Sequence, residues 1–189
     1  MSEFALHDES TAPEGSRPLF EVVERKFGFV PNVIRAMAES PQAAEAYLTL
    51  SQLFDKSGLD PVERQVVLLS ISFANGCGYC MAAHSGSARQ AGMPDDVLAA
   101  LREGRPLPDG KLEALRRFSE RMVEKRGWLD DADIDAFLAA GYEKRHVFDV
   151  ILAIAMKTLS NYTNHVVHTP LDPVLEPLAW QPPESAAAE

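Results

Sequence analysis

Apolar residues recur at helical spacing almost throughout residues 17–175, between residues that start and stop helices. In one segment, Val62, Val66, Leu69 and Phe73 stand at i, i+4, i+7 and i+11, behind an Asp-Pro pair typical of a helix N-terminus. No run of β-branched residues alternates with polar ones between turn signals, as a half-buried strand would require. The sequence therefore predicts an all-α fold, and 189 residues suit a single domain.

Glycine, proline and capping residues divide the chain into nine predicted helices and two tails. The helices are expected at residues 17–27, 31–39, 43–56, 61–74, 78–90, 94–103, 111–126, 132–140 and 143–165. No linker interrupts them, so residues 17–175 are predicted to form one helical domain. Residues 1–16 are acidic and lack Lys and Arg, and they are predicted to form a flexible N-terminal tail. Residues 176–189 are predicted to form a C-terminal tail.

The charge balance excludes several classes of partner. With 18 basic and 28 acidic residues the chain carries a net charge of −10, which offers no electrostatic footprint for nucleic acid or an anionic membrane. A membrane-spanning helix needs about 20 predominantly apolar residues, and the best apolar runs are short or carry a charge. No basic and then apolar leader is present at the N-terminus. We therefore expect a cytoplasmic protein without nucleic acid or membrane partners.

The only two cysteines form a Cys-Gly-Tyr-Cys motif, and a histidine follows four residues later. Cys77, Cys80 and His84 share one face of a helix, and the Asn75-Gly76 break places Cys77 near its first turn. Unpaired N–H groups and the helix dipole lower a cysteine pKa there, and an imidazole one turn away can accept the thiol proton. The spacing predicts a redox-active dithiol, in which one thiol reacts with an oxidant and the other closes a disulfide.

Two other interpretations of this motif remain open. Buried cysteines often serve only as small apolar side chains. A structural zinc ion could bind Cys77, Cys80 and His84, with His165 as the fourth ligand that zinc requires. A thioredoxin fold is disfavoured, because its CxxC motif follows a strand.

Two segments around the cysteines resemble a known family. Residues 63–69 (ERQVVLL) and 75–85 (NGCGYCMAAHS) resemble the core of the AhpD-like family, which belongs to the carboxymuconolactone decarboxylase superfamily. Residues 29–33 (FVPNV) and 157–165 (KTLSNYTNH) resemble one uncharacterised branch of it. The resemblance implies an AhpD-like helical bundle that assembles into homo-oligomers, trimers or hexamers.

The resemblance also implies an activity, a thiol-dependent alkylhydroperoxidase. Cys80 would be the peroxidatic thiol, Cys77 the resolving thiol, and His84 part of the proton relay that activates Cys80. Best-known members use a glutamate twelve residues before the first cysteine, where this chain has Gln65. An amide hydrogen-bonds but cannot take a proton, so this departure weakens the peroxidase expectation.

Substrates, partners and alternative functions follow from the same chemistry. The expected substrate is a hydroperoxide or a small disulfide, and an unidentified lipoylated or thioredoxin-like protein would supply reducing equivalents. No cofactor or metal is predicted. The alternatives are a redox-sensing or binding homo-oligomer with little turnover, and a disulfide reductase without peroxidase activity.

Four polar residues lie along one flank at the end of the last predicted helix. We expect these last turns to emerge into solvent; the alternative is a subunit interface or a wall of the active-site cavity. The residues are Lys157, Asn161, His165 and His168.

Overall fold

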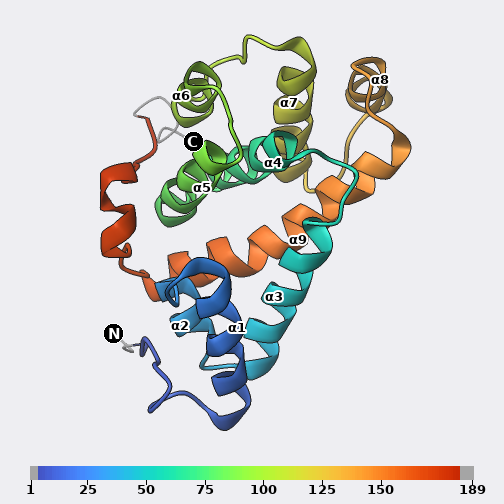
Figure 1. Cartoon of the computed structure of the whole chain (residues 1–189). Helices are drawn as coiled ribbons and strands as arrows, with labels where there is room; N and C mark the ends of the chain where they lie inside the picture. The colour runs from blue at the N-terminus through green and yellow to red at the C-terminus, as the bar shows by residue number, and fades with distance from the viewer. Residues whose placement is uncertain (1–3, 184–189) are drawn as a thin grey trace.

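The computed structural model describes residues 4–183, and in this range the chain forms helices and no strand, as predicted. Figure 1 shows their arrangement. The α-helices are α1 (Arg17–Phe27), α2 (Asn32–Met37), α3 (Pro41–Phe54), α4 (Pro61–Ala74), α5 (Gly78–Gln90), α6 (Asp95–Glu103), α7 (Gly110–Glu124), α8 (Asp131–Ala139) and α9 (Lys144–Val167). Two 3-10 helices, η1 (Glu14–Ser16) and η2 (Pro173–Leu178), flank them.

Helix α4 begins where the sequence predicts, and its cap points one acidic side chain into the interior. The Asp60 carboxylate accepts the Glu63 N–H at 2.8 Å, and the Glu63 carboxylate accepts the Asp60 N–H at 3.0 Å. Glu63 also accepts hydrogen bonds from Lys111 of α7 at 2.8 Å and from the Tyr142 hydroxyl at 3.2 Å. Burial opposes ionisation of Glu63, but these hydrogen bonds outweigh it and lower the pKa of the carboxyl.

Helices α4 and α9 cross the middle of the molecule and carry most of the packing. Helix α4 packs against α5, α6, α7 and α9, while α3 runs along α9. In Figure 1, α1 and α2 lie on the opposite side of α9 from α6 and α7. The larger apolar core contains fully buried residues of α4, α5 and α7, among them Val66, Leu69, Ile71, Met81 and Leu115.

A smaller apolar cluster lies where α1 and α2 approach α5. It contains Phe20, Val33, Ile34 and both cysteines. The CxxC motif is therefore packed against residues of the N-terminal helices.

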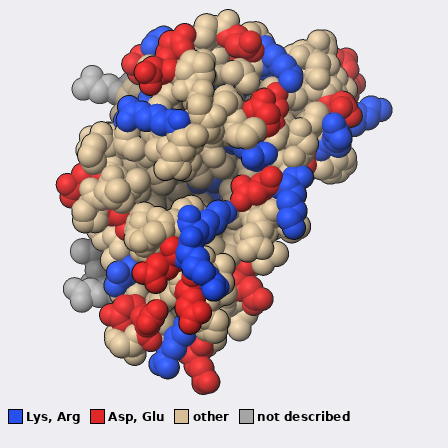
Figure 2. Space-filling model, in the orientation of Figure 1, with Lys and Arg blue, Asp and Glu red and all other residues tan. Residues whose placement is uncertain are grey.

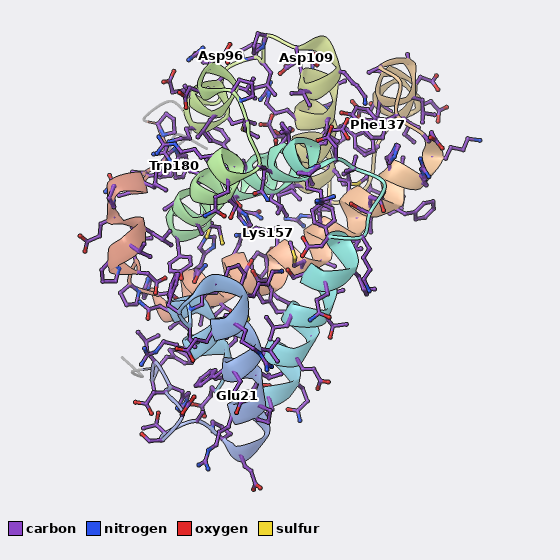
Figure 3. All side chains as sticks on the ribbon, in the orientation of Figure 1. Glu21, Asp96, Asp109, Phe137, Lys157 and Trp180 are labelled. Atoms are coloured by element: carbon purple, nitrogen blue, oxygen red, sulfur yellow. The ribbon has the colours of Figure 1, made fainter. Side chains whose placement is uncertain are left out.

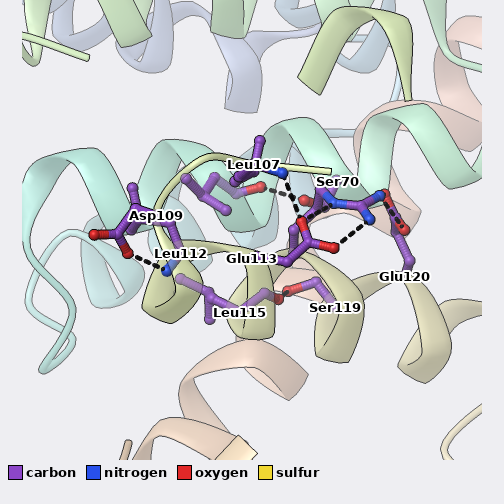
Figure 4. Close-up of polar contacts among 10 residues, drawn as sticks. Ser70, Leu107, Asp109, Leu112, Glu113, Leu115, Ser119 and Glu120 are labelled. Carbon is purple, nitrogen blue, oxygen red and sulfur yellow. Dashed lines mark hydrogen bonds and ion pairs between the residues drawn. The ribbon is translucent and has the colours of Figure 1, made fainter. Parts of the chain in front are cut away.

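Helix α7 is fixed at its start and along one side by polar contacts, shown in Figure 4. Asp109 caps it by accepting the Leu112 N–H at 2.8 Å. Arg116 donates to both Glu113 and Glu120 at 2.8 Å, and Glu113 also accepts the Leu107 N–H at 2.9 Å. The loop between α6 and α7 is thus tied to α7, against which α4 packs.

Described parts of both predicted tails contact the helices. On the N-terminal side, the His7 N–H donates to the Arg35 carbonyl at 3.1 Å, and the Ser16 hydroxyl donates to the Ala38 carbonyl at 2.7 Å. On the C-terminal side, the Trp180 indole N–H donates to the Arg102 carbonyl at 2.7 Å (Figure 3). Residues 1–3 and 184–189 of the predicted tails lie outside the described residues.

Helix length and surface charge relate to the prediction that the chain has no membrane or nucleic acid partner. Across residues 4–183, every helix falls short of the length or apolar character that crossing a bilayer demands. On the face drawn in Figure 2, acidic and basic side chains are interspersed, and neither sign forms one continuous patch.

Candidate active site

The break between α4 and α5 determines where the two cysteines lie. Gly76 adopts a left-handed conformation with φ of +63°, which favours glycine, and the Cys77 N–H donates back to the Ser72 carbonyl at 2.9 Å. Cys77 is the N-cap of α5, so Cys80 lies in its first turn. This is the placement that the Asn-Gly signal predicts. Gly78 is also required sterically, because a Cβ there would lie 2.8 Å from the Trp180 carbonyl oxygen.

Both cysteines are free thiols in the interior, with exposed fractions of 1% for Cys77 and 3% for Cys80. The Asn164 side-chain amide from α9 donates to the Cys80 sulfur at 3.3 Å and lies 3.8 Å from the Cys77 sulfur. The Cys80 sulfur is also 3.9 Å from the Ser160 hydroxyl. The Asn164 amide therefore bridges the two sulfurs. Two polar side chains of α9, Asn164 and Ser160, lie beside the Cys80 sulfur.

The surroundings separate the acidities of the two thiols. The pKa of Cys80 is lowered well below its usual value, chiefly by a hydrogen bond from Cys77 and, against the cost of burial, by the charge and hydrogen bonding of Lys157. Ser160 lowers it further. The pKa of Cys77 is raised, because it donates to Cys80 and is buried. Of the two thiols, Cys80 therefore has the surroundings that favour the thiolate, and Cys77 has those that favour the protonated form.

His84 lies between a lysine and a glutamine. Its Nε2 is 2.9 Å from the Lys157 Nζ, and its Nδ1 is 3.2 Å from the Gln65 Oε1. An ammonium group can only donate, so Nε2 accepts from it, and Nδ1 carries the hydrogen donated to Gln65. Burial and the Lys157 charge lower the pKa of His84 well below its usual value. The imidazole is therefore neutral, with its tautomer set by its two partners.

The four polar residues near the end of α9 are not all exposed to solvent, as we expected them to be. Lys157 and Asn161 are fully buried rather than solvated, and only His165 and His168 are exposed. Figure 3 shows Lys157 in the middle of the molecule, near α5 and α9. The expectation was wrong for the first two residues because α4 and α5 cover this face of α9. Sequence reasoning also missed Ser160 and Asn164, although residues 157, 160, 161 and 164 form a polar stripe at helical spacing.

A cavity of about 410 Å³ reaches Cys80 but not Cys77. Its polar end is formed by Cys80, His84, Tyr47 and Ser160. Burial and the nearby Cys80 sulfur raise the pKa of Tyr47, so its phenol stays protonated. The remaining walls come from α1, α2, α3, α5 and the C-terminal segment. They include the apolar residues Val22, Val23, Phe27, Val33, Ile34, Leu48, Val174 and Leu175 and the polar residues Lys26, Ser51, Gln52, Ser87 and Gln90.

Tyr79, between the two cysteines, fixes one wall of this cavity. Its hydroxyl donates to the buried Asp172 carboxylate, which also accepts the Asn32 N–H at 3.1 Å. The start of α2 and the segment before η2 are thereby held against the CxxC motif.

The described residues do not support the zinc interpretation. In residues 4–183, no group of three or more His, Cys, Asp or Glu side chains is arranged to hold a metal ion. The proposed fourth ligand, His165, lies on the exposed side of α9.

Of the residues singled out from the sequence, the structure brings together Cys80, His84 and Gln65, with Cys77 beside Cys80. Gln65 and Glu63 point to different sides of α4, toward His84 and Lys111 respectively, as their spacing predicts. The geometry gives one thiol that lines a cavity, a second thiol that does not, and a fully buried lysine whose Nζ lies 2.9 Å from His84.

Comparison with known proteins finds similarity to one family in the segment that contains this site. Residues 41–131 match the carboxymuconolactone decarboxylase family, a segment that includes Gln65, both cysteines and His84. A 52-residue stretch is 38% identical to the alkyl hydroperoxide reductase AhpD of Solibacter usitatus (strain Ellin6076). That stretch spans 27% of this chain and 29% of the relative.

Solved structures share the fold over nearly the whole chain. An uncharacterised peroxidase-related protein from Ralstonia eutropha JMP134, described as an alkylhydroperoxidase AhpD core, superimposes with a TM-score of 0.80 at 22% identity, covering 92% of this chain and 94% of the other. The debrominase Bmp8 in complex with 2,3,4-tribromopyrrole superimposes with a TM-score of 0.79 at 20% identity, covering 94% and 96%. The chain is thus similar to the carboxymuconolactone decarboxylase family over residues 41–131, and it shares the AhpD-like fold.

Proposed function

We propose that this protein reduces organic hydroperoxides through Cys80, with Cys77 as the resolving thiol. One observation carries the proposal: Cys80 lines the cavity, while Cys77 lies outside it and close enough that the Asn164 amide contacts both sulfurs. The surroundings also lower the pKa of Cys80. A thiolate is the nucleophilic form of cysteine, so an oxidant entering the cavity meets the reactive sulfur first.

The reaction proceeds in two steps on the protein and a third with an external reductant. The Cys80 thiolate attacks the terminal oxygen of the hydroperoxide; the O–O bond breaks, a sulfenic acid forms, and the alkoxide takes a proton from solvent. The Cys77 thiol then attacks the sulfenic acid, releasing water and closing a disulfide. A lipoylated or thioredoxin-like dithiol reduces this disulfide by exchange.

The test uses reduced protein and cumene hydroperoxide. Wild type is expected to consume one equivalent without a reductant, losing both thiols, and many equivalents when dihydrolipoamide is present. Cys80→Ser should consume none. Equal consumption by wild type and Cys80→Ser would end the proposal.

The alternative of a redox sensor makes a different kinetic prediction. A sensor oxidises once, stoichiometrically, and does not cycle at a useful rate when dihydrolipoamide is supplied. The observation that favours a sensor is Gln65 beside His84, because an amide cannot take a proton as a glutamate could. A disulfide reductase would cycle with a small disulfide substrate and leave cumene hydroperoxide unchanged.

A second candidate is reductive dehalogenation of a small aromatic compound. Its support is the apolar cavity ending at Cys80, together with the fold shared with Bmp8. The dithiol would supply two electrons, so that a carbon–bromine bond is replaced by carbon–hydrogen, bromide leaves and the disulfide forms. Bromide release from 2,3,4-tribromopyrrole by reduced wild type, and none by Cys80→Ser, would favour this candidate.

We also propose that the chain forms a homo-oligomer through the outer face of α9. An exposed stripe there consists of Phe148, Ile151, Tyr162 and Val166, and it carries no charge. In a chain of net charge −10, a second copy meets least repulsion at such a face. Ile151→Glu should lower the mass found by sedimentation, with Phe4→Glu as an exposed control; a monomeric wild type would refute the proposal.

The setting we propose is the cytoplasm. A dithiol that must be reset by exchange requires a compartment that maintains reduced thiols.

A further inference from the structure

Lys157 places an ammonium group in the interior without an acidic partner. Its side chain is fully buried, and none of the ion pairs among residues 4–183 includes it. Removing a charge from water costs several kcal/mol unless an opposite charge or good hydrogen bonds compensate. A lysine that keeps its charge in this position therefore requires an anion.

The groups around Lys157 leave a single candidate for that anion. Helix α5 contributes His84 and the two cysteines, which interact with Lys157. Next to these groups lie Gln65 of α4, beside His84, and the Tyr47 phenol of α3, near Cys80. Helix α9 adds the uncharged Ser160, Asn161 and Asn164. His84 accepts from Lys157 as a neutral ring, Cys77 and Tyr47 stay protonated, and Gln65 is an amide. The cysteine pair is left to carry the negative charge, and of its two sulfurs Cys80 is the one that hydrogen-bonds to Lys157.

We propose that Lys157 is the counter-ion of the Cys80 thiolate, and that His84 and Gln65 position its ammonium group rather than take the proton of Cys80. The proposal rests on the proposed function only in treating Cys80 as the reacting thiol. It departs from the role in the proton relay that the family resemblance implies for His84. The acceptor that a relay base would need is already occupied, because Nε2 receives the Lys157 hydrogen at 2.9 Å.

A counter-ion has a thermodynamic consequence that a structural lysine lacks. It stabilises the reduced, thiolate form of the pair and contributes nothing to the uncharged disulfide. Lys157 therefore makes the disulfide easier to reduce, as in oxidoreductases whose reduced form is stabilised.

The first test measures the protonation of Cys80 directly. In a Cys77→Ser background, which keeps a hydrogen-bond donor beside Cys80, the rate of iodoacetamide alkylation and the thiolate absorbance at about 240 nm are followed against pH. Lys157→Met should move both inflections to higher pH by at least one unit, and at any pH below both inflections it should slow alkylation about tenfold or more. Ser160→Ala, which removes a hydrogen bond but no charge, is the matched control and should move them less.

The second test measures the redox equilibrium in the two-cysteine protein. Against a dithiothreitol or glutathione buffer, the Lys157→Met disulfide should be at least tenfold harder to reduce, which corresponds to about 30 mV. Lys157→Gln serves for both measurements if Lys157→Met does not fold.

The outcomes separate this inference from the proposed function. Unchanged alkylation and absorbance profiles in folded Lys157 variants would overturn it, even in an active peroxidase. The predicted shift in a protein that reduces no hydroperoxide would support it and refute the proposed function.

Discussion

The charge pair inferred in the core predicts an unusual pattern of stabilities. Cys80→Ala removes the anion and leaves the Lys157 ammonium buried alone. Breaking a buried ion pair on one side costs about 3–5 kcal/mol, whereas replacing both partners with apolar groups is often neutral or stabilising. Because Lys157 is 0% exposed and Cys80 only 3%, solvent cannot relieve the cost. Cys80→Ala should therefore be strongly destabilised, and adding Lys157→Met should recover most of the loss.

The expected loss of unfolding free energy corresponds to a fall in melting temperature, and the size of that fall depends on chain length. For domains of 150–250 residues, 1 kcal/mol shifts the melting temperature by about 2–4 °C, so Cys80→Ala should melt roughly 6–20 °C below wild type. Cys77→Ala is the matched control, because it loses the same atoms from an equally buried position. It loses packing worth roughly 1 kcal/mol and a hydrogen bond to Cys80 worth roughly 1.5–3 kcal/mol, but it leaves no unpaired charge, so adding Lys157→Met should bring no recovery.

The assay is a double-mutant cycle of thermal melts at pH 7, with reductant present so that no disulfide contributes. The coupling between positions 80 and 157 is the part of the double-mutant effect that the single variants do not account for. Equal losses in Cys80→Ala and Cys77→Ala, together with no recovery on adding Lys157→Met, would refute the pairing of Lys157 with Cys80.

Three further predictions concern single residues. Cys77→Ser should reduce one equivalent of hydroperoxide and then stall with Cys80 as a sulfenic acid, which dimedone labelling and mass spectrometry would detect; undiminished turnover would contradict the resolving role. Folding lowers the pKa of Glu63 from its ordinary 4.5, so its contribution to stability is present above pH 4.5 and is lost as the pH falls through the lowered value. Urea melts of Glu63→Gln between about pH 6 and pH 3 should therefore show a weaker decline than wild type, and parallel declines would count against this linkage. Gln65→Glu should slow alkylation of Cys80 at pH 7, because it adds a second anion to compete for Lys157; faster alkylation would contradict the counter-ion scheme.

The helices and their ends were largely predictable because their signals are local. The Asp-Pro start of α4 and the Asn-Gly break before α5 were both expected from caps and turns. The end of α9 was placed too early, at 165 rather than Val167, since the helix closes at His168 in a left-handed conformation without glycine. Helix η2 was missed because a proline-rich segment gives no helical periodicity.

The candidate site was predictable only where its members share one helix. Cys77, Cys80 and His84 are related by spacing along α5, so their common face follows from the sequence. Lys157 lies 73 residues from His84 in the chain, and its burial depends on how α4, α5 and α9 pack together. The sequence shows a lysine on an otherwise apolar helix, but only tertiary packing shows which charge it faces.

The contact between His84 and Lys157 changes how the glutamine at position 65 is interpreted. From the family resemblance alone, glutamine in place of glutamate is a loss, because it removes a proton acceptor. In the structure, Gln65 contacts an imidazole that is itself hydrogen-bonded to a buried ammonium group. A glutamate there would give one buried cation two competing anions, and each additional charge removed from water carries its own desolvation cost. A neutral amide instead orients His84 and leaves the Lys157 charge to the Cys80 thiolate. The departure from the family pattern is thus consistent with another route to an acidic cysteine, in which a fixed positive charge replaces a proton relay.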